Sequence, residues 1–152
     1  MRTSRSVLSL GELQNLISNY EICSVENDER LADEHKYFIH LLYKYLPKPS
    51  RHRRDFMERT NLGKDIYSEL RGYKIGGRKK DISLLRVAFG LGITYEEALI
   101  LFLYNGRTLV YDETSRKINR ILLKLDDFEN KSDSEKRMAT LDFLIYDYNL
   151  KL

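Results

Sequence analysis

Cysteine, proline and long apolar runs are scarce in this chain, and each scarcity excludes a class of protein. The 152 residues include one cysteine, Cys23, which cannot form an intrachain disulfide and suits a reducing compartment. No apolar run approaches the length of a membrane-spanning helix, and the apolar pair Val7-Leu8 is too short for the core of a signal peptide. The sequence therefore predicts a cytoplasmic protein without a membrane span.

The residue types that carry catalysis or bind metals are also few and scattered. His35, His40 and His52 have no cysteine or carboxylate at metal-ligand spacing, and Cys23 has no evident base partner. The glycine-containing stretch at residues 76–80 (GGRKK) lacks the spacing and the Ser/Thr of a phosphate-binding Walker motif. We therefore expect no enzymatic activity, no metal and no cofactor.

What the chain does contain favours helix. It has only two prolines and eight glycines, and its 42% hydrophobic and 32% charged residues fit a globular protein with a real core. Apolar residues recur at helical spacing, and capping signals separate the segments. The pattern predicts an all-α fold, a compact bundle of about seven or eight helices with no substantial sheet. Helices are expected from the capping box at Ser9 to about Tyr20 and from the cap at Asn27 to about Leu46. Two short helices are expected at residues 55–60 and 63–71, and the next runs from the cap at Asp81 to Leu91. The last three are expected at residues 98–104 behind the capping box at Thr94, from Asp112 to about Leu125, and from the capping box at Ser132 to about Tyr148.

The expected helix at residues 82–91 and the N-terminal residues 1–26 each bear on how the domain is organised. Residues 82–91 are apolar on nearly every side, which is typical of a helix at the centre of a core, and Gly90 and Gly92 are expected to end it.

We assign residues 1–26 to an N-terminal helical extension and residues 27–152 to one helical domain. The stripe of the extension can either dock on its own domain or form a dimer interface; it comprises Leu10, Leu13, Ile17 and Tyr20.

Residues 55–72 (DFMERTNLGKDIYSELRG) are typical of two short helices joined by a tight turn. Asn61 tolerates the left-handed conformation that such a turn requires, and Gly63 can stand at the N-cap of the second helix. The spacing places Ile66, Tyr67 and Leu70 on the inner face of that helix. A helix-turn-helix protein uses this arrangement to present a helix to a DNA groove.

Basic residues concentrate around this motif. Residues 47–80 contain eleven Lys and Arg against four Asp and Glu, a local charge of +7, whereas the rest of the chain sums to −4. This asymmetry favours a basic face that binds a polyanion. We expect phosphate contacts from Arg51, Arg53, Arg54, Lys74, Arg78, Lys79 and Lys80.

Residues 28–148 resemble a helix-turn-helix family related to the Cro/repressor (XRE-like) fold, common in phage and mobile-element proteins. The resemblance lies in FMERTNL-GKDIYSELR, KKDISLLRVAFGLGITYEEALILFLYNGRTL and SRKINRILLKL, and LGIT-EEA with the following NGRTL is its most specific part. It implies that residues 63–71 form the recognition helix. The residues it would offer to DNA are Lys64, Asp65, Ser68, Glu69 and Arg71.

The predicted recognition helix departs from the family pattern in its charge. Asp65 and Glu69 lie four residues apart, so they share one face. A carboxylate can accept a hydrogen bond from cytosine, but phosphates repel it.

Three functions stay open. The first is a small transcriptional regulator that binds double-stranded DNA, with a homodimer as one assembly. The second is a protein-interaction module that keeps the fold without reading DNA, such as a phage or mobile-element factor that binds a host or regulatory protein; Asp65 and Glu69 favour it. The third is nonspecific binding of RNA or single strands through the basic segment.

Overall fold

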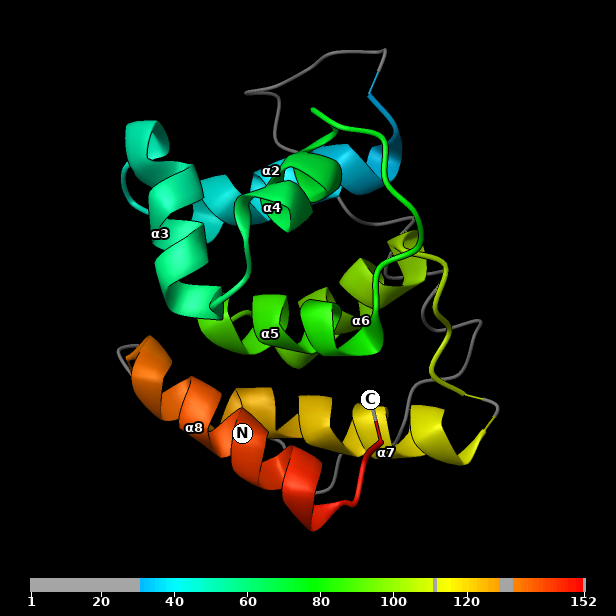
Figure 1. The fold of residues 1–152 in the computed structure, drawn as a ribbon. Coiled ribbons are helices and arrows are strands. Elements are labelled where there is room, and N and C mark those ends of the chain that lie inside the picture. The colour runs from blue at the N-terminus through cyan, green and yellow to red at the C-terminus, as the bar shows by residue number, and fades with distance from the viewer. Residues whose placement is uncertain (1–30, 111, 129–132, 152) are drawn as a thin grey trace.

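Helices α5 (Asp81–Leu91) and α6 (Tyr95–Tyr104) form the middle of the protein (Figure 1). The computed structural model describes residues 31–110, 112–128 and 133–151. The predicted N-terminal extension, with Cys23, lies outside these residues. The described residues form seven α-helices and no strand, which confirms the predicted all-α fold.

Two groups of helices cover this middle layer. On one side lie α2 (Asp33–Tyr45), α3 (His52–Thr60) and α4 (Lys64–Arg71), and on the other lie α7 (Glu113–Leu123) and α8 (Ser134–Asp147) (Figure 1). Helix α5 packs against α3 and α8. Every residue of α5 from Ser83 to Leu91 except Arg86 is buried, so its apolar pattern correctly predicted a central helix.

The end of α5 corrects one detail of the sequence prediction. Gly92 is the left-handed C-cap, with a φ of 74°, as expected. Gly90, however, lies inside the helix and does not end it. A Cβ at Gly90 would lie 2.7 Å from the carbonyl oxygen of Arg59 and 2.9 Å from Cα of Thr60. Glycine therefore allows α5 to approach the backbone at the end of α3.

Arg137 of α8 holds the same end of α5 from the other side. Its side chain is buried, and it donates from Nε to the carbonyl oxygen of Phe89 at 2.7 Å and from Nη2 to that of Gly90 at 3.0 Å. The last carbonyl groups of a helix have no partner within it and carry partial negative charge. A guanidinium from α8 thus caps α5. Burial, with the nearby charge of Arg59, lowers the pKa of Arg137.

Glu97 joins α6 to α2. It completes the predicted capping box with Thr94, and its carboxylate also accepts from Lys44 Nζ at 2.6 Å and from the Tyr45 hydroxyl. Burial alone would raise the pKa of Glu97, but the bonds from Lys44, Thr94 and Tyr45 hold it below its usual value. This contact fixes α2, the helix against which α4 packs.

Candidate nucleic-acid interface

The turn between α3 and α4 consists of Asn61, Leu62 and Gly63. Asn61 has the expected left-handed conformation, with φ of 58° and ψ of 27°, and its amide donates to the Met57 carbonyl at 3.0 Å. Gly63 is the N-cap of α4, as predicted, and supplies no side-chain cap. Helix α3 begins at His52, three residues before the expected start at Asp55. We call α3, this turn and α4 the α3–α4 unit.

An aromatic cluster holds the α3–α4 unit on the core. The ring centroid of Tyr67 in α4 lies 5.3 Å from that of Phe56 in α3 and 5.9 Å from that of Phe38 in α2. Tyr67 and Leu70 are buried and Ile66 packs against the core, so the predicted inner face of α4 is correct. Burying such side chains contributes about 1.5–3 kcal/mol each, so α4 is held in one orientation.

Two histidines also lie beside the α3–α4 unit. Nδ1 of His35 hydrogen-bonds the Leu70 carbonyl at 2.8 Å, near the end of α4. The buried ring of His52 packs edge-on against Tyr43, with centroids 4.8 Å apart. Burial and the charge of Arg71 lower the pKa of His52, which favours its neutral form. Within the described residues, no group of His, Cys, Asp and Glu is arranged to hold a metal ion.

The outer face of α4 presents less negative charge than its sequence indicates. Lys64 and Asp65 are exposed, whereas Ser68, Glu69 and Arg71 are partly covered. Asp65 Oδ1 lies 3.5 Å from Lys74 Nζ, and Glu69 pairs with Lys79. The Lys79 side chain is only 8% exposed, and its ammonium also donates to the Gly77 carbonyl at 2.8 Å. Lys79, predicted to contact phosphate, is therefore engaged inside the protein in this conformation.

Both carboxylates of α4 thus contact the segment that follows it. We call residues 72–80 the 72–80 loop. Its start is fixed by Gly72, which has a φ of 89°, and by a bond from the Tyr73 amide to the Ser68 carbonyl at 2.8 Å. Arg71 lies over the Tyr73 ring at 5.1 Å and donates to its hydroxyl at 2.5 Å. The loop is therefore tied to α4 by side chains as well as by backbone.

The other two carboxylates of residues 47–80 lie on α3, and both are ion-paired. Asp55 lies 3.6 Å from Arg51, and Glu58 lies 3.2 Å from Arg54. All four acidic residues of the segment therefore face a Lys or Arg. Several exposed basic residues have no carboxylate within ion-pair distance in the described parts of the chain: Lys48, Arg53, Lys64, Arg78 and Lys80.

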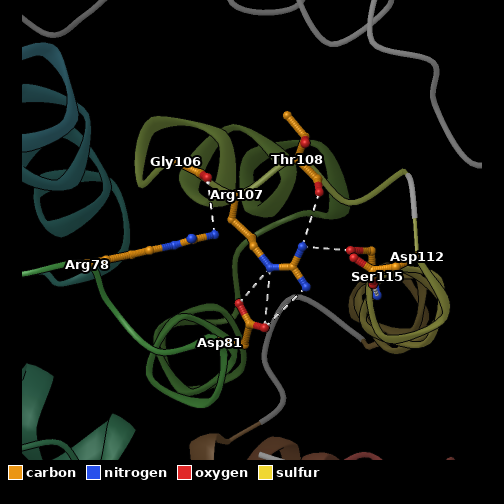
Figure 2. A network of polar contacts seen from close by, with 7 residues as sticks. All are labelled: Arg78, Asp81, Gly106, Arg107, Thr108, Asp112 and Ser115. Carbon is orange, nitrogen blue, oxygen red and sulfur yellow. Dashed lines mark hydrogen bonds and ion pairs between the residues drawn. The ribbon is translucent and has the colours of Figure 1, made fainter.

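Arg107 is a positioning residue that sequence reasoning did not single out, although it lies in the NGRTL stretch. Its guanidinium contacts Asp81 at the start of α5, with Nε 3.1 Å from Oδ1, and donates from Nη1 to Ser115 Oγ in α7 at 2.7 Å (Figure 2). Arg78 reaches the same region through the Gly106 carbonyl at 3.4 Å. Arg107 thus fixes the point where the 72–80 loop enters α5.

Replacing Arg107 by Met should lower the free energy of unfolding by about 2 kcal/mol, because it removes charge-assisted bonds to a partly buried carboxylate and hydroxyl. Arg107→Lys should recover only part of this loss, since an ammonium cannot span Asp81 and Ser115 as the planar guanidinium does. Urea denaturation followed by circular dichroism measures both changes. Equal stability of the Met variant and the natural protein would contradict this role.

Comparison of the chain with protein-family models, with curated proteins and with solved structures found no match. The resemblance to XRE-like helix-turn-helix proteins therefore stays a prediction. In the part of the chain that the structure describes, each helix is too short or too polar to cross a lipid bilayer.

Proposed function

We propose that this protein binds double-stranded DNA through the α3–α4 unit, with α4 as the recognition helix in the major groove, and acts as a small transcriptional regulator. The α3–α4 unit has the short turn and the inner apolar face that such a unit needs. Lys64 and Ser68 lie on the first turns of α4, from which recognition helices contact base edges. The XRE-like resemblance supports the same role.

The observation that carries the proposal is the pairing of charges around the α3–α4 unit. As free carboxylates, Asp65 and Glu69 would oppose DNA binding. Each instead faces a lysine of the 72–80 loop, so its repulsion of phosphate is partly compensated. Four of the exposed cations without a carboxylate partner bind phosphate in this proposal, namely Arg53, Lys64, Arg78 and Lys80, with Lys79 serving as a structural partner of Glu69.

Fluorescence anisotropy with labelled duplex DNA over a range of salt tests this function. Affinity should fall linearly with salt on a log–log plot, because each phosphate contact releases counterions and adds about 0.9 to the slope. The combined variant Arg53→Ala, Arg78→Ala and Lys80→Ala should weaken binding to all sequences alike. It should also flatten the slope by about 0.9 for each cation that binds a phosphate in the natural protein.

A charge-matched control removes three exposed cations from other helices: Arg120→Ala, Lys124→Ala and Lys136→Ala. This variant should change the slope little, although it lowers the net charge equally. Absence of binding to any duplex at low salt would refute the proposed function, and equal slopes for the two variants would refute the assignment of the contact surface.

A second candidate function, binding of another protein, has its own observation. Helix α8 exposes Phe143 by 61% and Tyr146 by 84%, and residues three apart share a helix face. Large exposed apolar side chains that lie together are typical of protein-binding surfaces. Recovery of one stoichiometric partner that is lost with Phe143→Ser, combined with no duplex binding, would favour this function over DNA recognition.

A further inference from the structure

The 72–80 loop carries an isoleucine that the fold leaves almost entirely in water. Ile75 is 99% exposed, and the neighbouring Tyr73 is 70% exposed. Figure 1 shows this loop leaving the end of α4 at the outer edge of the molecule before it descends to α5. We propose that the 72–80 loop is a DNA-binding wing that inserts Ile75 between base pairs in the minor groove and bends the duplex. This inference rests on the proposed function and names a second contact of the same site.

The loop is held in place before any ligand binds. Lys74 is paired with Asp65 in the first turn of α4, which folds the start of the loop back along the helix. Lys79 is paired with Glu69, and a Cβ at Gly76 would clash with the Glu69 carboxylate, so the tip lies directly against this group. A loop ordered in advance loses little conformational entropy when it binds. The two acidic residues of α4 therefore position the wing.

The charge around the tip selects the ligand. Lys74 precedes Ile75, and Arg78 and Lys80 follow it, all three exposed. The acidic side chains of α4 that hold the loop, Asp65 and Glu69, are already paired with its lysines. An apolar side chain surrounded by cations is complementary to an apolar site with negative charge on both sides. A DNA base step is such a site, because it lies between two phosphate backbones.

The shape of the tip suits the minor groove. Gly77 has open space at its Cβ position, so this part of the loop presents little bulk beyond its backbone. Isoleucine is among the side chains that minor-groove proteins use as wedges, and such wedges unstack a base step and kink DNA by about 20–90°. The deep, narrow major groove and shallow minor groove of an RNA duplex offer no equivalent site. The proposal therefore commits to DNA.

Bending is measured by energy transfer between dyes at the two ends of an A·T-rich duplex of about three helical turns with a central TA step, which unstacks easily. The natural protein should raise the transfer efficiency. Ile75→Ser should remove most of this rise in transfer efficiency. The dependence of its DNA affinity on salt should stay unchanged, because the substitution removes no cation. Its thermal stability should also stay unchanged, since the isoleucine side chain is almost entirely in solvent.

Phe143→Ser is the matched control, because it removes another exposed apolar side chain from α8. It should leave the rise in transfer intact. If the natural protein binds the duplex without bending it, or if Ile75→Ser bends it equally, the wing is refuted and the proposed function stands. If no duplex binds at low salt, the proposed function fails and the wing fails with it.

Discussion

Replacing Arg137 by Met is expected to lower the free energy of unfolding by roughly 3–6 kcal/mol, because two charge-assisted hydrogen bonds of about 1.5–3 kcal/mol each are lost. The carbonyl groups of Phe89 and Gly90 would remain buried at the end of α5 without these donors. Methionine has a side chain of similar length. The loss of stability therefore reports mainly the missing hydrogen bonds to the end of α5 and less a change in packing. Urea denaturation of the natural protein and the variant gives the difference.

Two further variants sharpen this test. Arg137→Lys keeps the charge near the negative end of α5 but cannot reproduce the forked geometry, so an intermediate loss is expected. Arg120→Met, at an exposed position of α7, should stay within about 0.5 kcal/mol of the natural protein. If Arg137→Met is as stable as the natural protein, the relief of the buried charge cancels the loss of the cap, and the expected net contribution of the cap is refuted.

Substituting Gly90 by Ala should destabilise the protein by about 1–3 kcal/mol, the range expected of overpacking in a well-packed core. In a free helix the same change is favourable by about 1 kcal/mol, because alanine has the higher helix propensity. Here the added Cβ would lie 2.7 Å from the Arg59 carbonyl oxygen and 2.9 Å from Cα of Thr60, both backbone atoms. Backbone cannot rotate away as a flexible side chain can, so α3 and α5 must separate.

Gly77→Ala is the matched control, because no atom lies within 4 Å of its Cβ position and the backbone is not in the left-handed region. Thermal denaturation should give a lower melting temperature for Gly90→Ala and no such decrease for Gly77→Ala. Since Thr60 directly precedes the turn of the α3–α4 unit, Gly90→Ala should also weaken any duplex binding. A stabilised Gly90→Ala variant would show that the close approach is not required.

Local chemistry accounts for what the sequence predicted correctly. The cap at Thr94 with Glu97, the left-handed Asn61 and the end of α5 at Gly92 each depend on backbone geometry within one helical turn. The inner face of α4 follows from the period of 3.6 residues. The order of the helices and the place of α5 at the centre could therefore be read from residue types and spacing.

Residue types and spacing could not show which charged side chains near the α3–α4 unit are accessible to solvent. The sequence indicates that Asp65 and Glu69 share a face, but their partners Lys74 and Lys79 lie in the next segment of chain. Helical periodicity carries no information about how a loop with three glycines folds back on the preceding helix. The sequence therefore predicts a phosphate contact from Lys79, whereas its ammonium pairs with Glu69 and the Gly77 carbonyl within the same protein.

The sequence by itself determined the all-α architecture, the α3–α4 unit and the excess of positive charge around that unit, because each depends on composition or on neighbours within a few residues. Only the tertiary structure decided which of these charges face solvent, why Gly90 must lack a side chain and that Arg137 caps α5. Those properties arise where segments far apart in the chain approach within hydrogen-bonding or van der Waals distance.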